Sequence, residues 1–159
     1  MSKAGSRIPA RVASAFLVGV SLIPAVGLAS DWPSWRGPSQ NGVSDETGLP
    51  SSWSPEGENL VWSDAWIGRS TPAVFDGRVC ANGRTGEGIS EKENVACWNA
   101  ETGTKLWEHA FSLANTTVPF NRLGWGSVTG DPETGYLYAM NVDGYLNCFD
   151  REGSIVWSW

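Results

Sequence analysis

Two stretches of the chain share one pattern: ACWNAETGTKLWE at residues 96–108 and NCFDREGSIVWS at residues 147–158, about 50 residues apart. Each stretch has a cysteine, an aromatic residue, an Asn or Asp, a glycine and then a tryptophan. Runs of β-branched and aromatic residues stand on both sides of the glycine, which is typical of a β-hairpin. A repeated unit of this length with such hairpins predicts one four-stranded propeller blade per copy.

The repeat continues upstream of both stretches. Residues 77–80, GRVC, match residues 135–138, GYLY, so the blade repeats cover about 70–110 and 126–159. The sequence therefore predicts an all-β fold, an incomplete β-propeller of four-stranded antiparallel blades with about two blades and one outer strand. The expected strands cover residues 59–63, 71–75, 78–82, 94–99, 105–110, 127–130, 136–140, 145–150 and 154–159.

Tryptophans and glycines hold fixed positions in the repeat. A third, partial copy, GENLVW, places Trp62 where the full copies have Trp107 and Trp157. We expect each tryptophan to wedge between neighbouring sheets, where burying such an aromatic side chain contributes on the order of 2 to 3 kcal/mol. Gly103 and Gly153 stand in the preceding turns, where glycine takes a positive φ at little cost.

The first 29 residues differ from the rest of the chain. They begin with Lys3, Arg7 and Arg11, continue with an uncharged apolar run over 12–29, and end in small residues. This pattern predicts a secretory signal peptide at 1–29 and an exported protein, periplasmic or extracellular. The alternative is a retained membrane anchor, because the run is just long enough to span a bilayer.

After the signal peptide we expect two regions. Residues 30–58 form an irregular segment rich in Trp, Pro and Gly, and residues 59–159 carry the propeller repeats. Removing residues 1–29 would remove three of the 11 Lys and Arg and none of the 17 Asp and Glu, so the net charge would change from −6 to −9. An acidic surface disfavours nucleic acid as a partner and leaves protein or cell-envelope partners.

The alignment of the repeats also places the cysteines. If the strands pair around the turn at 142–144, Tyr138 lies opposite Cys148, and the aligned residues Cys80 and Cys97 face each other. Directly opposed residues have Cα atoms ~4.5 to 5.5 Å apart, within disulfide range, and an exported protein meets oxidants. We expect a Cys80–Cys97 disulfide, with two buried thiols as the alternative; Cys148 is left unpaired.

The pattern resembles the pyrroloquinoline-quinone-like (PQQ-like) β-propeller repeat, in which a small residue, a hydrophobic residue and Asp-x-x-Thr-Gly-x-x-x-Trp follow one another. The first copy has Asn99 in place of the Asp, and the second copy lacks the Thr. The segment DWPSWRGPSQNGVS, residues 31–44, is similar to the opening of secreted bacterial proteins that carry this repeat. Together these resemblances cover residues 31–159 and suggest a protein of the secreted bacterial type.

The resemblance implies one of two functions. One group of the family comprises quinoprotein dehydrogenases, which hold the quinone and a calcium ion over the propeller axis. The other group is non-catalytic and includes the lipoprotein of the outer-membrane assembly machine, which binds protein partners. The dehydrogenase reading requires an adjacent Cys-Cys pair, and the three cysteines of this chain are never adjacent. The lone His109 has no metal-spaced partner, and we expect it to face solvent.

We therefore expect a non-catalytic binding or scaffold module with no catalytic residue, no metal and no cofactor. The alternative is the N-terminal part of a PQQ-dependent dehydrogenase, which would bind PQQ with calcium. Two repeats cannot close a ring, so we expect a fragment of a longer protein that self-associates. By the geometry of the family, a ligand would meet the loops that precede each inner strand. These loops carry Arg69, Ser70, Thr71, Trp125 and Ser127.

Overall fold

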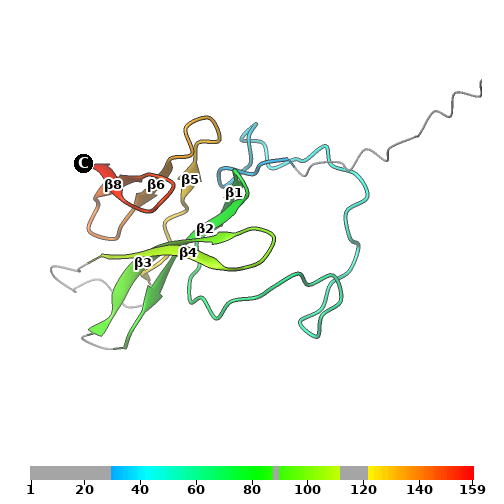
Figure 1. The fold of residues 1–159 in the computed structure, drawn as a ribbon, viewed down its shortest axis with the longest axis horizontal. Coiled ribbons are helices and arrows are strands. Elements are labelled where there is room, and N and C mark those ends of the chain that lie inside the picture. Colours follow the sequence, from blue (N-terminus) through cyan, green and yellow to red (C-terminus); the bar gives the residue numbers. More distant parts are fainter. Residues whose placement is uncertain (1–29, 88–89, 112–121) are drawn as a thin grey trace, which may run out of the picture.

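The computed structural model describes residues 30–87, 90–111 and 122–159; the expected signal peptide lies outside these ranges. The described residues form two four-stranded antiparallel sheets and no α-helix (Figure 1), so the chain folds as two neighbouring blades of a β-propeller. In each sheet the strands follow one another in chain order. The first sheet contains β1 (Ala73–Phe75), β2 (Arg78–Thr85), β3 (Lys92–Asn99) and β4 (Lys105–Phe111). The second contains β5 (Thr129–Gly130), β6 (Leu137–Met140), β7 (Leu146–Phe149) and β8 (Ile155–Ser158).

Every expected strand but one is observed, with ends that differ from the expected bounds by up to three residues. Residues 59–63 form no strand, although Trp62 takes the position that the partial repeat predicts. A strand needs a row of backbone donors and acceptors beside it, and the described part of the chain offers none here. The segment is held by its side chains instead, because the indole N–H of Trp62 donates to the carbonyl oxygen of Ala100 at 2.8 Å. No helix among the described residues is long and apolar enough to cross a membrane.

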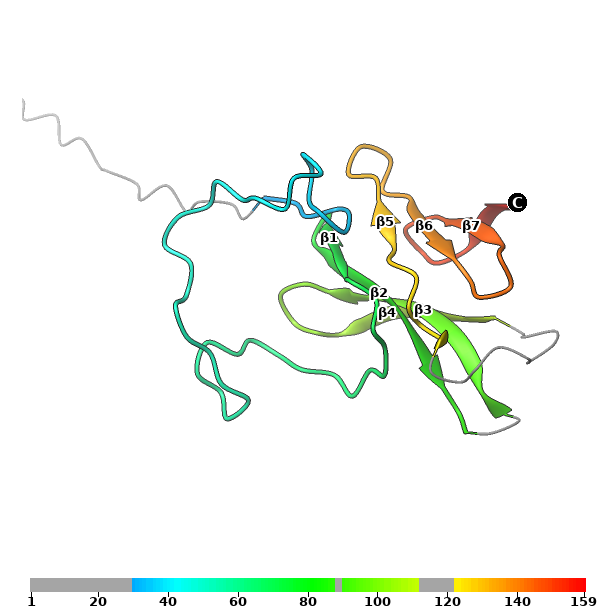
Figure 2. The ribbon, with the colours of Figure 1, turned by 180° about the vertical axis from the view of Figure 1, so that it is seen from behind.

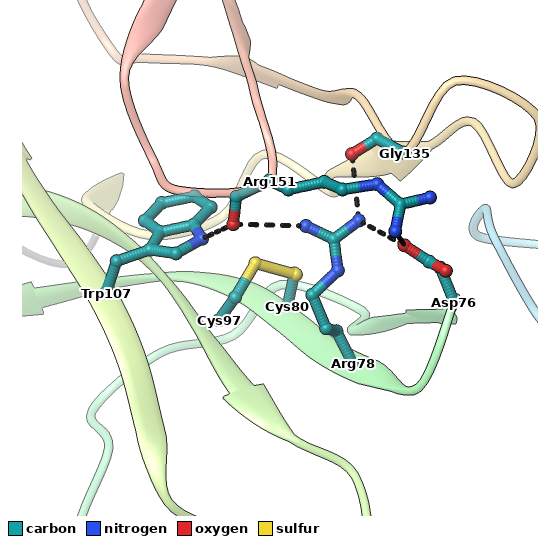
Figure 3. Close-up of a disulfide and its surroundings, with 7 residues drawn as sticks. All are labelled: Asp76, Arg78, Cys80, Cys97, Trp107, Gly135 and Arg151. Atoms are coloured by element: carbon teal, nitrogen blue, oxygen red, sulfur yellow. Dashed lines mark hydrogen bonds and ion pairs between the residues drawn. A yellow bond between two sulfur atoms is a disulfide. The ribbon is translucent and has the colours of Figure 1, made fainter.

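The pairing of β2 with β3 brings the two cysteines of the first blade together. Cys80 lies directly opposite Cys97 with a Cα–Cα distance of 4.1 Å, and the two residues form a disulfide (Figure 3). In the second blade Tyr138 and Cys148 are paired at the equivalent position, and Cys148 is a buried free cysteine. The disulfide therefore lies in the middle of the first sheet, where both half-cystines are fully buried.

The two blades meet through one tryptophan of the repeat, Trp107, whereas Trp157 on the outer strand of the second blade is 42% exposed. Trp107 of β4 lies against the turn between β7 and β8, and its indole N–H donates to the carbonyl oxygen of Arg151 at 3.0 Å (Figure 3). A Cβ atom built on Gly153 would lie 2.5 Å from the Trp107 ring. Trp62 makes the same contact one repeat earlier, because a Cβ on Gly103 would lie 2.6 Å from its ring. Each turn thus needs a glycine because an indole occupies the space of a side chain.

The hydrophobic core fills the space between the sheets. It combines buried residues of both blades, among them Phe75 and Phe111 of the first and Val128, Leu137 and Phe149 of the second. Trp107 packs against this core and stacks on Phe149, with ring centroids 5.5 Å apart. One continuous core across the two blades makes their relative placement part of the folding free energy.

The N-terminal segment begins beside β1 and β5 and then leads away from both sheets (Figure 2). Trp32 exchanges two backbone hydrogen bonds with Val74 of β1, at 2.6 and 2.9 Å. The next residue, Pro33, accepts a hydrogen bond from the backbone N–H of Gly130 of β5 at 2.7 Å. The segment therefore joins the innermost strands of the two blades and satisfies backbone groups that neither sheet pairs by itself.

Candidate functional site

The five residues that the sequence points to as a ligand-facing set come from two loops that the structure brings together. The backbone N–H of Arg69 donates to the carbonyl oxygen of Gly124 at 3.0 Å, and that of Thr71 donates to Oγ of Ser127 at 3.4 Å. One loop leads into β1 and the other into β5, so the set lies where the inner strands of the two blades begin. We call Arg69, Ser70, Thr71, Trp125 and Ser127 the loop cluster.

The exposed part of the loop cluster is an arginine stacked on a tryptophan. The guanidinium carbon of Arg69 lies 5.6 Å from the centre of the Trp125 ring. Trp125 is 52% exposed, and Arg69 is exposed as well. A cation–π contact of this kind contributes about 0.5 to 1 kcal/mol at an exposed site. Within the described residues no carboxylate forms an ion pair with Arg69, so its guanidinium N–H groups are available to a ligand.

A buried asparagine of β2 contacts both loops of the loop cluster. Asn82 is 1% exposed, and its side-chain amide donates to the carbonyl oxygen of Gly126 at 2.8 Å. Its backbone carbonyl accepts a hydrogen bond from Oγ of Ser70 at 2.9 Å. Asn82 therefore contacts both loops, one through its main chain and one through its side chain. Its side-chain oxygen has no hydrogen-bond partner among the described residues, and an unpaired buried polar atom lowers the stability of the fold.

A buried glutamate is the second support. Glu93 of β3 is 2% exposed, and its carboxylate accepts backbone N–H groups from Gly124 at 3.0 Å and Val142 at 2.6 Å. Gly124 lies in the loop that leads into β5 and Val142 lies in the turn between β6 and β7, so one side chain of the first blade holds two loops of the second. Burial raises the pKa of Glu93 and outweighs the two backbone hydrogen bonds, which lower it. The side chain acts as a positioning group because backbone groups surround both of its oxygens.

A second polar contact between the blades lies at the opposite end of β1 and β5. The guanidinium of Arg78 donates to Asp76 at 3.1 Å and to the carbonyl oxygen of Gly135 at 2.8 Å (Figure 3). Arg151 of the second blade forms an ion pair with the same Asp76 at 3.0 Å. Burial lowers the pKa of Arg78, against the effect of Asp76. This group of charges links the two blades, with Arg78 buried and the side chain of Arg151 52% exposed.

His109 does not face solvent as the sequence analysis predicted. Its ring is partly buried and lies 5.0 Å from the ring of Phe111 and 5.3 Å from that of Phe149. The expectation was wrong because β4 turns this side toward the second blade. Burial between the two phenylalanines lowers the pKa of His109, so the imidazole is neutral at pH 7. These aromatic contacts give the histidine a packing role.

Among the described residues the cysteines are not arranged as an adjacent pair. The only cysteines in contact are Cys80 and Cys97, and their disulfide is buried inside a sheet and joins two different strands. It does not present the flat pair of adjacent cysteines that the dehydrogenase group places against its quinone. Among the described residues there is also no group of three or more His, Cys, Asp or Glu side chains that could hold a metal ion. Asn99 is the last residue of β3, and Asp143 and Asp150 lie in the hairpin connections of the second blade.

Comparison with known proteins finds similarity among solved structures. No family model matches the chain, and no curated protein matches it. Among solved structures the chain is similar to BamB from Moraxella catarrhalis, with 18% sequence identity and a TM-score of 0.29. The match covers 57% of this chain and 34% of the BamB chain, so the chain spans about a third of that protein. The fold assignment rests on the two sheets and on the repeated contacts between them.

Proposed function

We propose that this chain is an exported, non-catalytic β-propeller module that binds protein partners of the cell envelope through the loop cluster. The observation that carries the proposal is the exposed Arg69–Trp125 pair, held by loops of two neighbouring blades. Arginine and tryptophan are the residue types that contribute most often to binding energy at protein interfaces. The pair stands on a rigid base, so little conformational entropy is lost when a partner binds.

The chemistry of the pair indicates what kind of partner segment it fits. The guanidinium group donates hydrogen bonds in a fork that matches a carboxylate, and the indole offers an apolar face. Ser127, two residues after Trp125, is also exposed and adds a hydroxyl to the same loop. A protein segment with a carboxylate next to an apolar or aromatic residue is complementary to all three groups. Arg69 also stands out as a cation on a chain whose net charge is negative.

The proposal is tested by site-specific cross-linking of the full-length protein in the cells that export it. A photoreactive amino acid replaces Trp125, and in a control it replaces Trp35, which is 66% exposed on the N-terminal segment. We expect discrete cross-linked products from position 125 that disappear when Arg69 is changed to alanine, and none of these products from position 35. Identical products at both positions, or none at 125 in a correctly exported protein, would overturn the proposal.

The dehydrogenase alternative makes a separate prediction. The purified full-length protein, mixed with PQQ and calcium, should then show dye-linked oxidation of alcohols or sugars. The binding proposal predicts no such activity and needs no cofactor in this chain. The two tests are independent, because cross-linking measures partner binding and the oxidation assay measures quinone turnover.

A further inference from the structure

The sequence contains two Asn-Gly pairs, Asn41–Gly42 and Asn82–Gly83. In such a pair the backbone nitrogen of the glycine can attack the side-chain amide of the asparagine, because glycine has no side chain to shield that nitrogen. The structure places the two pairs in opposite environments. Asn41 and Gly42 are exposed in a turn of the N-terminal segment, whereas Asn82 and Gly83 are buried in β2.

The turn around the exposed pair holds the two reacting groups close together. The backbone N–H of Gly42 donates to the carbonyl oxygen of Arg36 at 2.9 Å, and Gly42 has φ of 74°, which favours glycine. The backbone N–H of Val43 donates to Oδ1 of Asn41 at 2.9 Å, which is the hydrogen bond of an Asx turn. The side chain of Asn41 is therefore folded over the backbone that follows it, and this brings its Cγ towards the nitrogen of Gly42.

Two donors polarise the groups that react. The guanidinium of Arg36 donates to the carbonyl oxygen of Asn41 at 3.0 Å. This carbonyl and the nitrogen of Gly42 belong to one peptide group, so a positive charge beside the oxygen favours loss of the N–H proton. The N–H of Val43 stabilises the negative charge that develops on Oδ1 when Cγ is attacked. The hydrogen bond from Gly42 to Arg36 must open first, and it lies in an exposed turn outside both sheets, where opening costs little.

We propose that Asn41 is a site of spontaneous modification in the folded protein, where it is converted through a succinimide to aspartate and isoaspartate. The nitrogen of Gly42 loses its proton to a base in the solvent and forms a bond to Cγ of Asn41. The bond from Cγ to the side-chain nitrogen breaks, and ammonia leaves with a proton from the solvent. Water then adds to either carbonyl group of the ring and opens it. This inference does not rest on the proposed function of the loop cluster.

The buried pair provides a comparison within the same molecule, because the fold prevents its reaction. The side-chain amide of Asn82 donates to the carbonyl oxygens of Gly126 and Met140, at 2.8 and 3.3 Å. Both acceptors belong to the second blade, so the amide is held away from the backbone of Gly83. Gly83 also lies within a paired strand, opposite Asn94. Reaction at Asn82 therefore requires the two blades to separate.

The modification changes the turn in two ways. Both products have a carboxylate at position 41, so a negative charge appears beside the guanidinium of Arg36. Isoaspartate also adds a carbon atom to the main chain between residues 41 and 42. The N–H of Gly42 then no longer meets the carbonyl oxygen of Arg36, so amide exchange at Gly42 should be faster in the isoaspartate product.

Peptide mass spectrometry of the purified full-length protein tests the proposal. The protein is incubated at mildly alkaline pH, either folded or in urea, and the conversion of each asparagine is followed with time. Electron-transfer fragmentation separates isoaspartate from aspartate. We expect the folded protein to lose Asn41 and to retain Asn82, whereas both asparagines should react in urea. The proposal is refuted if folded protein retains Asn41 over the time in which unfolded protein loses it, or if folded protein loses both asparagines equally.

Variants of Arg36 test whether the turn promotes the reaction. Arg36→Met removes the guanidinium and should slow the conversion of Asn41 about twofold to fivefold, the range expected for a charge contact at an exposed site. Arg36→Lys keeps the charge and should recover part of the rate. Amide exchange at Val74, whose N–H donates to the carbonyl oxygen of Trp32 at 2.9 Å, reports whether the segment stays in place. Unchanged conversion in Arg36→Met, with this contact intact, would contradict activation by the turn.

Discussion

The contact between Gly153 and Trp107 gives the sharpest test of how the two blades are joined. Gly153 has φ of 85° and Gly144 has φ of 91°, so alanine is strained at both positions. A Cβ on Gly144 would meet nothing within 4 Å, whereas a Cβ on Gly153 would lie 2.5 Å from the Trp107 ring. Gly144→Ala should therefore cost the backbone strain alone, about 1 to 2 kcal/mol of unfolding free energy.

Gly153→Ala should cost more, because the added methyl group also displaces the indole from its place. Overpacking of this kind costs about 1 to 3 kcal/mol, which brings the total to about 2 to 5 kcal/mol. Displacing the ring also weakens the 3.0 Å hydrogen bond from the indole N–H of Trp107 to the carbonyl oxygen of Arg151. The measurement is urea unfolding of both variants, followed by far-ultraviolet circular dichroism, because tryptophan fluorescence would respond to the contact itself.

A double mutant isolates the contact. In a Trp107→Leu background the space above Gly153 is open, so Gly153→Ala should cost no more than Gly144→Ala does there. The coupling energy between the two positions should be at least about 1 kcal/mol. Equal costs of the two alanine variants in the wild-type background, or a coupling energy near zero, would refute the view that the turn glycine is needed to seat the indole.

Three further predictions follow from the contacts between the blades. Lowering the pH through 6.5 should reduce the unfolding free energy, because the unfolded chain binds a proton at His109 more readily than the folded chain does. His109→Leu should flatten the dependence of the unfolding free energy on pH. An unchanged dependence in this variant would contradict the lowered pKa of His109. Arg78→Met removes charged hydrogen bonds to an aspartate and to a carbonyl oxygen of the second blade, and should lower the unfolding free energy by about 1.5 to 3 kcal/mol in urea titrations. Thiol titration of denatured, unreduced protein should find Cys148 alone, whereas three reactive thiols would exclude the Cys80–Cys97 disulfide, whose reduction should cost about 3 kcal/mol.

The sequence predicted the parts of the fold that depend on local pattern. The turn glycines Gly103 and Gly153, the positions of the tryptophans and the facing of Cys80 and Cys97 all follow from aligning one repeat with the other. Each of these features is set by a hairpin, whose register is determined by residues close together in the chain. The prediction of a strand at 59–63 was wrong, because a strand also requires a neighbouring strand. A local sequence pattern does not show whether that neighbour is present.

The contacts between the blades could not be predicted in the same way. Glu93 and Asn82 bind backbone groups of the second repeat, and every residue except proline has such groups, so the sequence carries no signal for the pairing. The one available signal was an acidic residue directly before the apolar run NVACW of β3, which indicated a buried charge that needs partners. The environment of His109 depends in the same way on which face of β4 the second blade covers.

The residues of the loop cluster differ from the residues that pack the two blades together. The two sets can therefore be substituted separately. The tryptophan, glycine and disulfide contacts occupy buried positions and hold the sheets, whereas Arg69 and Trp125 are exposed and contribute little to the core. Their loops are fixed by Asn82 and Glu93, so the exposed pair can be exchanged without loosening its base. If the proposed function holds, substitutions of the pair should therefore alter partner choice before they alter stability.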